Sequence, residues 1–204
     1  MSLYKNKYRV ESTRLQNWNY GWNAKYFVTI VTKNRKHFFG EIENKKMILS
    51  EIGEIVCNEW LKTSDIRPDM NIKLDVFCIM PNHFHSIIEI GKNKYNKRDL
   101  KCDLNRRDAM HCVSTTNNTT NNTTNEPTKS KNKFGPQSKN LASIKRGIKS
   151  AVTIKARKIN PNFGWQSRYY DHIIRNDGEY QRIKNYIINN PKNWKDDIFN
   201  TENK

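Results

Sequence analysis

The sequence predicts an α+β fold with an antiparallel sheet, and three patterns lead to that class. Residues 26–32 are β-branched or aromatic throughout, which is typical of a strand. Two further apolar runs, at about 72–80 and 83–90, meet at a Pro-Asn break and therefore predict a hairpin. Apolar side chains recur at helical spacing over about 46–62 and again over 139–158, so the strands alternate with amphipathic helices.

The C-terminal region completes this pattern. Residues 169–175 have the composition of a strand, and Asn176 followed by Glu179 marks the start of a last helix. That helix is expected to end at Asn190, because Pro191 disfavours helical geometry in the residue before it. The predicted order is β-α-β-β-α-β and then a helix. This is the ferredoxin-like, or RRM-like, arrangement, in which an antiparallel sheet carries helices on one face.

The chain has 204 residues, enough for one domain with a hydrophobic core. Residues 1–20 are polar and aromatic and are expected to form an extended N-terminal arm. Residues 91–138 include a low-complexity run of Asn and Thr with nothing to bury, so they are expected to form a flexible insertion. We therefore predict a single domain over residues 1–204 that this insertion interrupts.

The charge of the chain is strongly positive. It holds 37 Lys and Arg against 20 Asp and Glu, a net charge of +17, which favours a polyanionic partner such as nucleic acid over a basic protein without one. No run approaches the ~20 apolar residues of a membrane span, so no membrane partner is predicted. The N-terminus lacks the apolar core of a signal peptide, and the cytoplasm is the expected location. The four cysteines lack zinc-ligand spacing and are expected to be reduced thiols.

Residues 139–158 combine an apolar stripe with charges of one sign. Seven of these residues are basic and none is acidic. A helix face that is merely solvated normally mixes both signs, so the one-sided face favours phosphate binding. We predict that three of its residues contact the backbone of DNA: Lys145, Arg146 and Lys149. The aromatic side chains of Trp165 and Tyr169 are expected to stack on bases.

Two histidines follow the Pro-Asn break. His83 and His85 are two residues apart, so on a strand both rings point to the same face and Phe84 points to the other. Two imidazoles on one face can bind a divalent cation. The alternative, two ordinary histidines at the start of a strand, is the commoner explanation of a bare His-x-His pattern.

Tyr186 and Asn190 lie four residues apart on the predicted last helix, and therefore on the same side of it. The amide oxygen of Asn190 is a hard ligand that suits Mg²⁺ or Mn²⁺. The phenol of Tyr186 can act as a covalent nucleophile. The alternative for Tyr186 alone is a packing residue of an amphipathic helix.

Three blocks of the sequence carry a resemblance to a known family. Residues 80–85, Met-Pro-Asn-His-Phe-His, resemble the histidine–hydrophobe–histidine (HUH) motif. Residues 165–175 and 179–191 resemble the downstream blocks of the REP-associated tyrosine transposases, which are single-tyrosine HUH transposases. The resemblance covers nearly the whole chain apart from the N-terminal arm and the insertion.

This resemblance implies a fold of the HUH endonuclease type and a metal-dependent endonuclease and strand transferase, a transposase. The substrate it implies is single-stranded DNA with hairpins, cleaved through a 5′-phosphotyrosine intermediate. In the matching positions, His83 and His85 bind the metal, Asn190 completes the metal site and Tyr186 is the nucleophile. The metal is Mg²⁺ or Mn²⁺, and two imidazole ligands favour Mn²⁺ slightly.

Two other interpretations remain open. A non-catalytic RRM-like protein would hold single-stranded nucleic acid without cutting it, and a decayed transposase would keep hairpin recognition for regulation. Binding alone needs no metal, so the His-Phe-His and Tyr-x-x-x-Asn patterns together favour the enzyme. Tyr169 and Tyr170 do not match the nucleophile position of the family. The sequence also leaves the choice between a monomer and a homodimer open.

Overall fold

The computed structural model describes residues 15, 18–96, 138–167 and 169–200. The predicted N-terminal arm and the predicted insertion lie largely outside these residues. Among the described helices, none is long and apolar enough to cross a membrane.

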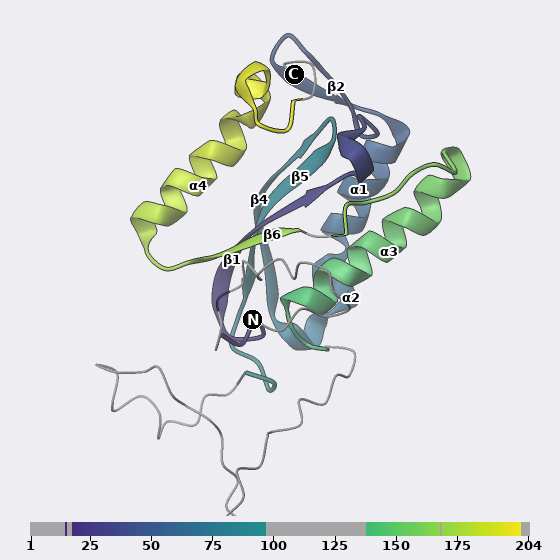
Figure 1. Cartoon of the computed structure of the whole chain (residues 1–204). Coiled ribbons are helices and arrows are strands. Elements are labelled where there is room, and N and C mark those ends of the chain that lie inside the picture. The colour runs from purple at the N-terminus through teal and green to yellow at the C-terminus, as the bar shows by residue number, and fades with distance from the viewer. Residues whose placement is uncertain (1–14, 16–17, 97–137, 168, 201–204) are drawn as a thin grey trace, which may run out of the picture.

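Four antiparallel strands form the main sheet (Figure 1). They are β1 (Ala24–Val31), β4 (Ile72–Met80), β5 (His83–Ile90) and β6 (Tyr170–Ile174), in the spatial order β4-β5-β1-β6. β4 and β5 form the predicted hairpin, with Met80 opposite His83, and β1 pairs with both β5 and β6. The strand predictions are therefore confirmed, with bounds that shift by at most two residues.

Helices cover both faces of this sheet. α1 (Glu51–Leu61) and α3 (Leu141–Ile159) lie side by side on one face, over a core that includes Tyr26 and Phe84. These two helices complete the predicted β-α-β-β-α-β pattern, and the ferredoxin-like fold is confirmed. The last helix departs from the predicted arrangement of helices on one face. α4 (Asp177–Asn189) lies on the opposite face, where its Ile183 and Ile187 share a second apolar cluster with Phe27. Because side chains alternate along a strand, β1 and β5 present one set of residues to α1 and α3 and the other set to α4.

The segment before α1 differs from the prediction. The apolar spacing predicts a helix from about residue 46, but β2 (Gly40–Glu43) and β3 (Lys46–Leu49) form a small hairpin and α1 begins only at Glu51. Asn44 and Lys45 make the turn with φ of 49° and 63°, and the Ser50 side chain caps α1 by accepting from the backbone N–H of Gly53. Ile48 precedes Ile52 by four residues, so the helical period continues across the boundary and could not locate it.

Short helical segments complete the fold. α2 (Thr63–Ile66) follows α1, and the 3₁₀ turns are η1 (Lys33–Arg35), η2 (Pro68–Met70) and η4 (Asn190–Asp196). α4 starts as predicted, with the Asn176 side chain accepting from the backbone N–H of Glu179, and it ends one residue before Asn190. Asn190 keeps helical dihedral angles, φ −55° and ψ −44°, as the chain enters η4. Asn190 therefore stays on the same side of the helix axis as Tyr186.

Candidate active site

The two histidines lie at the start of β5 on the face that α4 covers. Their ring centroids are 4.5 Å apart and both side chains are buried. Phe84, between them, points to the other face and packs against Trp60, with ring centroids 4.9 Å apart. The expectation that His83 and His85 share a face is therefore confirmed. Both rings belong to strand residues held between two neighbouring strands, so the pair is rigidly placed.

Asn82 fixes the protonation of His83. The Asn82 amide nitrogen donates to the carbonyl oxygens of Arg35 at 3.0 Å and Phe199 at 2.8 Å, which leaves its Oδ1 2.9 Å from Nδ1 of His83. An amide oxygen only accepts hydrogen bonds, so Nδ1 of His83 carries the proton and Nε2 carries the lone pair. Within the described part of the chain, this Nε2 is buried and has no hydrogen-bond partner. This nitrogen is a buried electron-pair donor that no described residue uses, and such an atom is suited to coordinate a metal ion.

His85 connects the pair to α4. Its Nδ1 lies 2.8 Å from Oγ1 of Thr29, and its Nε2 lies 3.2 Å from the hydroxyl of Tyr186. Burial lowers the pKa of His85 to about 3. Burial also lowers the pKa of His83 well below its usual value, with smaller contributions from His85 and nearby basic side chains. Both imidazoles are therefore neutral at physiological pH, the form that binds metals.

Tyr186 and Asn190 converge on the same place. Tyr186 is 43% exposed, whereas Asn190 is buried. Among the described residues, Oδ1 of Asn190 has no hydrogen-bond partner, which makes it the second unused buried acceptor beside the histidines. Burial, followed by the nearby Asp197 carboxylate, raises the pKa of the Tyr186 phenol, while the Asn190 amide opposes this shift. The phenol is therefore protonated at neutral pH and needs added positive charge to become a nucleophile.

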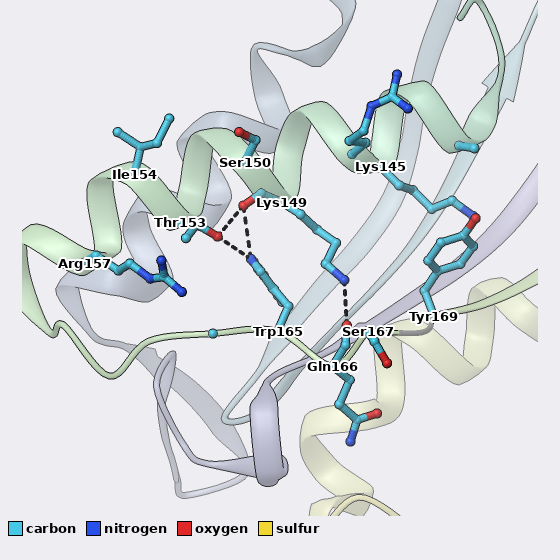
Figure 2. Close-up of a pocket in the computed structure, with 13 residues that line it drawn as sticks. Lys145, Lys149, Ser150, Thr153, Ile154, Arg157, Trp165, Gln166, Ser167 and Tyr169 are labelled. Carbon is cyan, nitrogen blue, oxygen red and sulfur yellow. Dashed lines mark hydrogen bonds between the residues drawn. The ribbon is translucent and has the colours of Figure 1, made fainter. Parts of the chain in front are cut away.

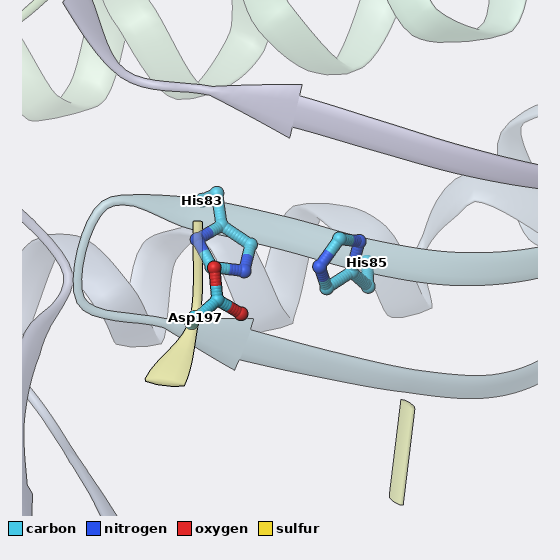
Figure 3. Close-up of side chains that lie close together, drawn as sticks. All are labelled: His83, His85 and Asp197. Atoms are coloured by element: carbon cyan, nitrogen blue, oxygen red, sulfur yellow. The ribbon is translucent and has the colours of Figure 1, made fainter. Parts of the chain in front are cut away.

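Asp197 is a functional candidate that the sequence interpretation missed. One carboxylate oxygen of Asp197 and one nitrogen from each of His83 and His85 all lie within 4.8 Å of one another (Figure 3). Burial raises the pKa of Asp197, and a hydrogen bond from the Phe199 backbone N–H opposes that shift. Two imidazoles, a carboxylate and an amide oxygen form a donor set that fits a divalent cation such as Mn²⁺ or Mg²⁺.

The segment after η4 brings Asp197 to the site. The Phe199 ring packs on His83, with centroids 4.6 Å apart, and Nη1 of Arg35 donates to the carbonyl oxygen of Ile198 at 2.8 Å. Asp197 is only three residues from Trp194, which also lies beside His83. The sequence signal that could have pointed to Asp197 is its position shortly after the Asn-Pro pair at residues 190–191. Its approach depends on η4 turning the chain back over β5, and no local pattern predicts that turn.

The five residues predicted to bind DNA all line a groove of about 540 Å³ on the other side of the molecule (Figure 2). The groove lies between α3 and the segment before β6, whereas the histidines face α4. Nζ of Lys149 donates to the carbonyl oxygen of Gln166 at 2.7 Å, and Nε1 of Trp165 donates to Oγ1 of Thr153 at 3.1 Å. Arg157 also lines the groove, so cationic groups are spread along it.

The position of Lys145 corrects one prediction. Lys145 is only 2% exposed, its Nζ lies 2.5 Å from Oδ2 of the buried Asp171 on β6, and it sits 3.2 Å from the centroid of the Tyr169 ring. A cation so committed within the protein is not available to a phosphate. The cause is its place on α3, because residue 145 follows Leu141 by four positions and precedes Ile148 by three, so it lies on the buried stripe. Tyr169, beneath the same ammonium, is likewise turned toward α3.

Comparisons with known proteins give a sequence relative and a solved structure that shares the fold. No family model matches the sequence. An uncharacterized protein of Haemophilus influenzae is 36% identical over 187 residues, which cover 91% of this chain and 90% of that protein. The chain belongs to the family of this Haemophilus protein.

The structure of this chain can also be compared with solved structures. The structure of a REP-associated tyrosine transposase bound to a REP hairpin superposes with a TM-score of 0.52 at 15% identity, over 90% of this chain and 74% of that one. The two proteins therefore share a fold, as the HUH-type prediction expected. A Deinococcus radiodurans structure covers 87% of this chain and 97% of its own, at 11% identity and a TM-score of 0.39.

Proposed function

We propose that this protein is a metal-dependent, single-stranded DNA endonuclease and strand transferase of the tyrosine transposase type, with Tyr186 as nucleophile. One observation carries the proposal. The Tyr186 hydroxyl lies 3.2 Å from Nε2 of His85, beside two buried acceptors, Nε2 of His83 and Oδ1 of Asn190, that lack partners among the described residues. A tyrosine that served packing alone would not need such neighbours. The shared fold with a REP-associated tyrosine transposase supports the same proposal.

In this proposal, His83 and His85 hold the metal through Nε2, with oxygen ligands from Asn190 and Asp197. A bound divalent metal would stabilise the charge that develops on the phosphoryl oxygens and the phenolate. Asn82 keeps the lone pair of His83 on Nε2, and Thr29 orients His85 through Nδ1. The half-buried position of Tyr186 holds its oxygen at the edge of the site, where a phosphate can approach.

The proposed reaction exchanges one phosphoester for another. The phenol of Tyr186 gives up its proton to solvent, its oxygen attacks phosphorus to form an O–P bond, and the bond between phosphorus and the 3′ oxygen breaks. The departing 3′ oxygen takes up a proton and becomes a free 3′-hydroxyl. A 3′-hydroxyl of another strand can then attack the 5′-phosphotyrosine, which restores the phosphodiester and the phenol. No external energy source is required, since the number of phosphoester bonds is unchanged.

We also propose that the groove beside α3 binds the phosphate backbone, chiefly through Arg146 and Arg157, with Lys149 at its centre and Trp165 along its wall. The net charge of +17 supports a polyanionic partner. Hairpin-containing single-stranded DNA is the proposed substrate. In this proposal Lys145 and Tyr169 line the groove but do not contact the phosphates.

The test is adduct formation. Purified protein is incubated with end-labelled hairpin DNA carrying single-stranded flanks, with Mn²⁺, with Mg²⁺ or with EDTA, and SDS-stable adducts are separated by electrophoresis. We expect a metal-dependent adduct that Tyr186→Phe abolishes. Tyr180→Phe is the matched control on the same helix, because its hydroxyl bonds to Asp75 and faces away from the histidines. DNA binding without an adduct under any metal condition would instead favour the non-catalytic, RRM-like interpretation.

A further inference from the structure

Tyr170 presents its ring on the face of the sheet that carries the candidate active site. It is the first residue of β6, the strand at one edge of the sheet. The next residue, Asp171, points toward α3 and pairs with Lys145, so strand alternation directs Tyr170 to the opposite face. Its side chain is 48% exposed. Tyr169, by contrast, lies under the Lys145 ammonium on the α3 side.

A buried ring connects Tyr170 to the histidines. Phe27 on β1 contacts Tyr170 edge to face, with centroids 6.0 Å apart, and stacks on His85 at 5.4 Å with an interplanar angle of 24°. Phe27 also contacts Tyr186 edge to face at 6.2 Å. Two ring-to-ring steps therefore separate Tyr170 from His85, and two separate it from Tyr186. Phe27 and His85 are buried, whereas Tyr170 and Tyr186 are the exposed members of this aromatic row.

We propose that the Tyr170 ring is a stacking platform for a base of the DNA strand that enters the active site. This inference rests on the proposed function, and it adds a base-binding subsite beside the phosphate site. Bases of a single strand are unpaired and offer an open π-face, and aromatic side chains in single-strand binding proteins take them with little sequence preference. A ring on a hydrogen-bonded strand is also pre-organised, so stacking would set the position of the neighbouring phosphate.

Binding measurements test the platform apart from catalysis. The Tyr186→Phe protein, which should not cleave, is titrated by fluorescence anisotropy against a fluorescein-labelled hairpin oligonucleotide with single-stranded flanks. Adding Tyr170→Leu should weaken binding about 5- to 150-fold, the range expected for loss of one base–aromatic stack. Adding Tyr170→Phe should restore it, because the ring is kept. Tyr95→Leu is the matched control, since Tyr95 is 43% exposed and bonds to Asp69 away from the site.

Photocrosslinking gives a second measurement, made on the protein that keeps Tyr170. The flank carries 5-iododeoxyuridine, the complex is irradiated, and the linked peptide is sequenced by mass spectrometry. A crosslink at Tyr170 supports the platform even if the leucine variant folds poorly. Equal affinities for the Tyr170→Leu and parent proteins, or crosslinks only at other residues, would overturn it. A parent protein that binds DNA but never forms an adduct would refute the nuclease proposal alone, and one that binds no DNA would refute both.

Discussion

The two faces of the sheet differ in how their buried polar groups are used. On the α3 side, the cations and the indole that the sequence singled out bond within the protein: Lys145 to Asp171, Lys149 to a backbone carbonyl and Trp165 to Thr153. On the α4 side, Nε2 of His83 and Oδ1 of Asn190 are buried without a partner among the described residues. A buried polar atom without a partner destabilises the fold, by about 1–3 kcal/mol each. Nε1 of Trp60 on α1 is also buried without a partner among the described residues, so an unpartnered atom alone does not mark a site. The α4 side differs because its unpartnered acceptors lie close to further candidate ligands, His85 and Asp197, and this grouping indicates a ligand site.

The largest expected effect comes from the α4 side, where the candidate metal ligands are grouped. His83→Ala should abolish adduct formation, because it removes a proposed metal ligand, yet leave the affinity for hairpin DNA within about threefold, since phosphate contacts supply most of the affinity. Adduct gels and anisotropy titrations of the same protein preparation measure both quantities. A folded variant that loses binding and cleavage in equal measure would contradict this separation.

The buried ion pair should matter for stability. Lys145→Met leaves the Asp171 carboxylate buried without its cation and should lower the free energy of unfolding by about 3–5 kcal/mol. The double variant Lys145→Met, Asp171→Leu should recover much of that loss, because both charges of the pair are removed. Urea denaturation followed by circular dichroism measures each variant. If Lys145→Met were as stable as the parent protein but bound DNA more weakly, the original assignment of Lys145 to phosphate contact would be correct.

These contrasts show what local sequence patterns can and cannot predict. The strands and the shared face of His83 and His85 follow from residue type and a period of two, so they were predictable. The sign of the charges on residues 139–158 was equally visible, but Lys145 falls on the apolar stripe, and its partner Asp171 is distant in sequence. Asp197 reaches the histidines only through the path of η4. Contacts that depend on chain reversal or on strand order carry no local signal.

Asn82 offers a smaller and more specific effect. Asn82→Ala removes the acceptor that holds the proton on Nδ1 of His83, so the affinity for the metal should fall about 10- to 100-fold. The concentration of Mn²⁺ that gives half-maximal adduct formation should rise by that factor, while the yield at saturating Mn²⁺ changes little. Asn82→Asp keeps an acceptor for Nδ1 but loses the amide donations to the Arg35 and Phe199 carbonyls, so it separates the two roles of Asn82. A Mn²⁺ requirement in this variant closer to that of the parent than to that of the alanine variant would assign the effect to the Nδ1 contact. An unchanged Mn²⁺ requirement in the alanine variant would show that Asn82 serves only the turn.

The smallest expected effect belongs to the groove. Arg146→Ala should weaken binding to all DNA sequences alike and reduce the slope of log affinity against log salt by about one, the value for one lost phosphate contact. Lys149→Ala should change the slope less, because its ammonium already donates to Gln166. Lys46→Ala, exposed on β3, is the control. If Arg146→Ala and Lys46→Ala gave the same slope as the parent, the backbone would lie elsewhere.

The central claim is that Tyr186 becomes covalently linked to DNA. The most direct measurement is peptide mapping of the SDS-stable adduct, in which trypsin and nuclease digestion leave a short nucleotide tag that mass spectrometry locates on one residue. We predict the tag on Tyr186, attached through a 5′ phosphate, and no tag in the Tyr186→Phe protein. A tag on Tyr169 or Tyr170 with Tyr186 unmodified would contradict the account and move the nucleophile to β6 and the segment before it.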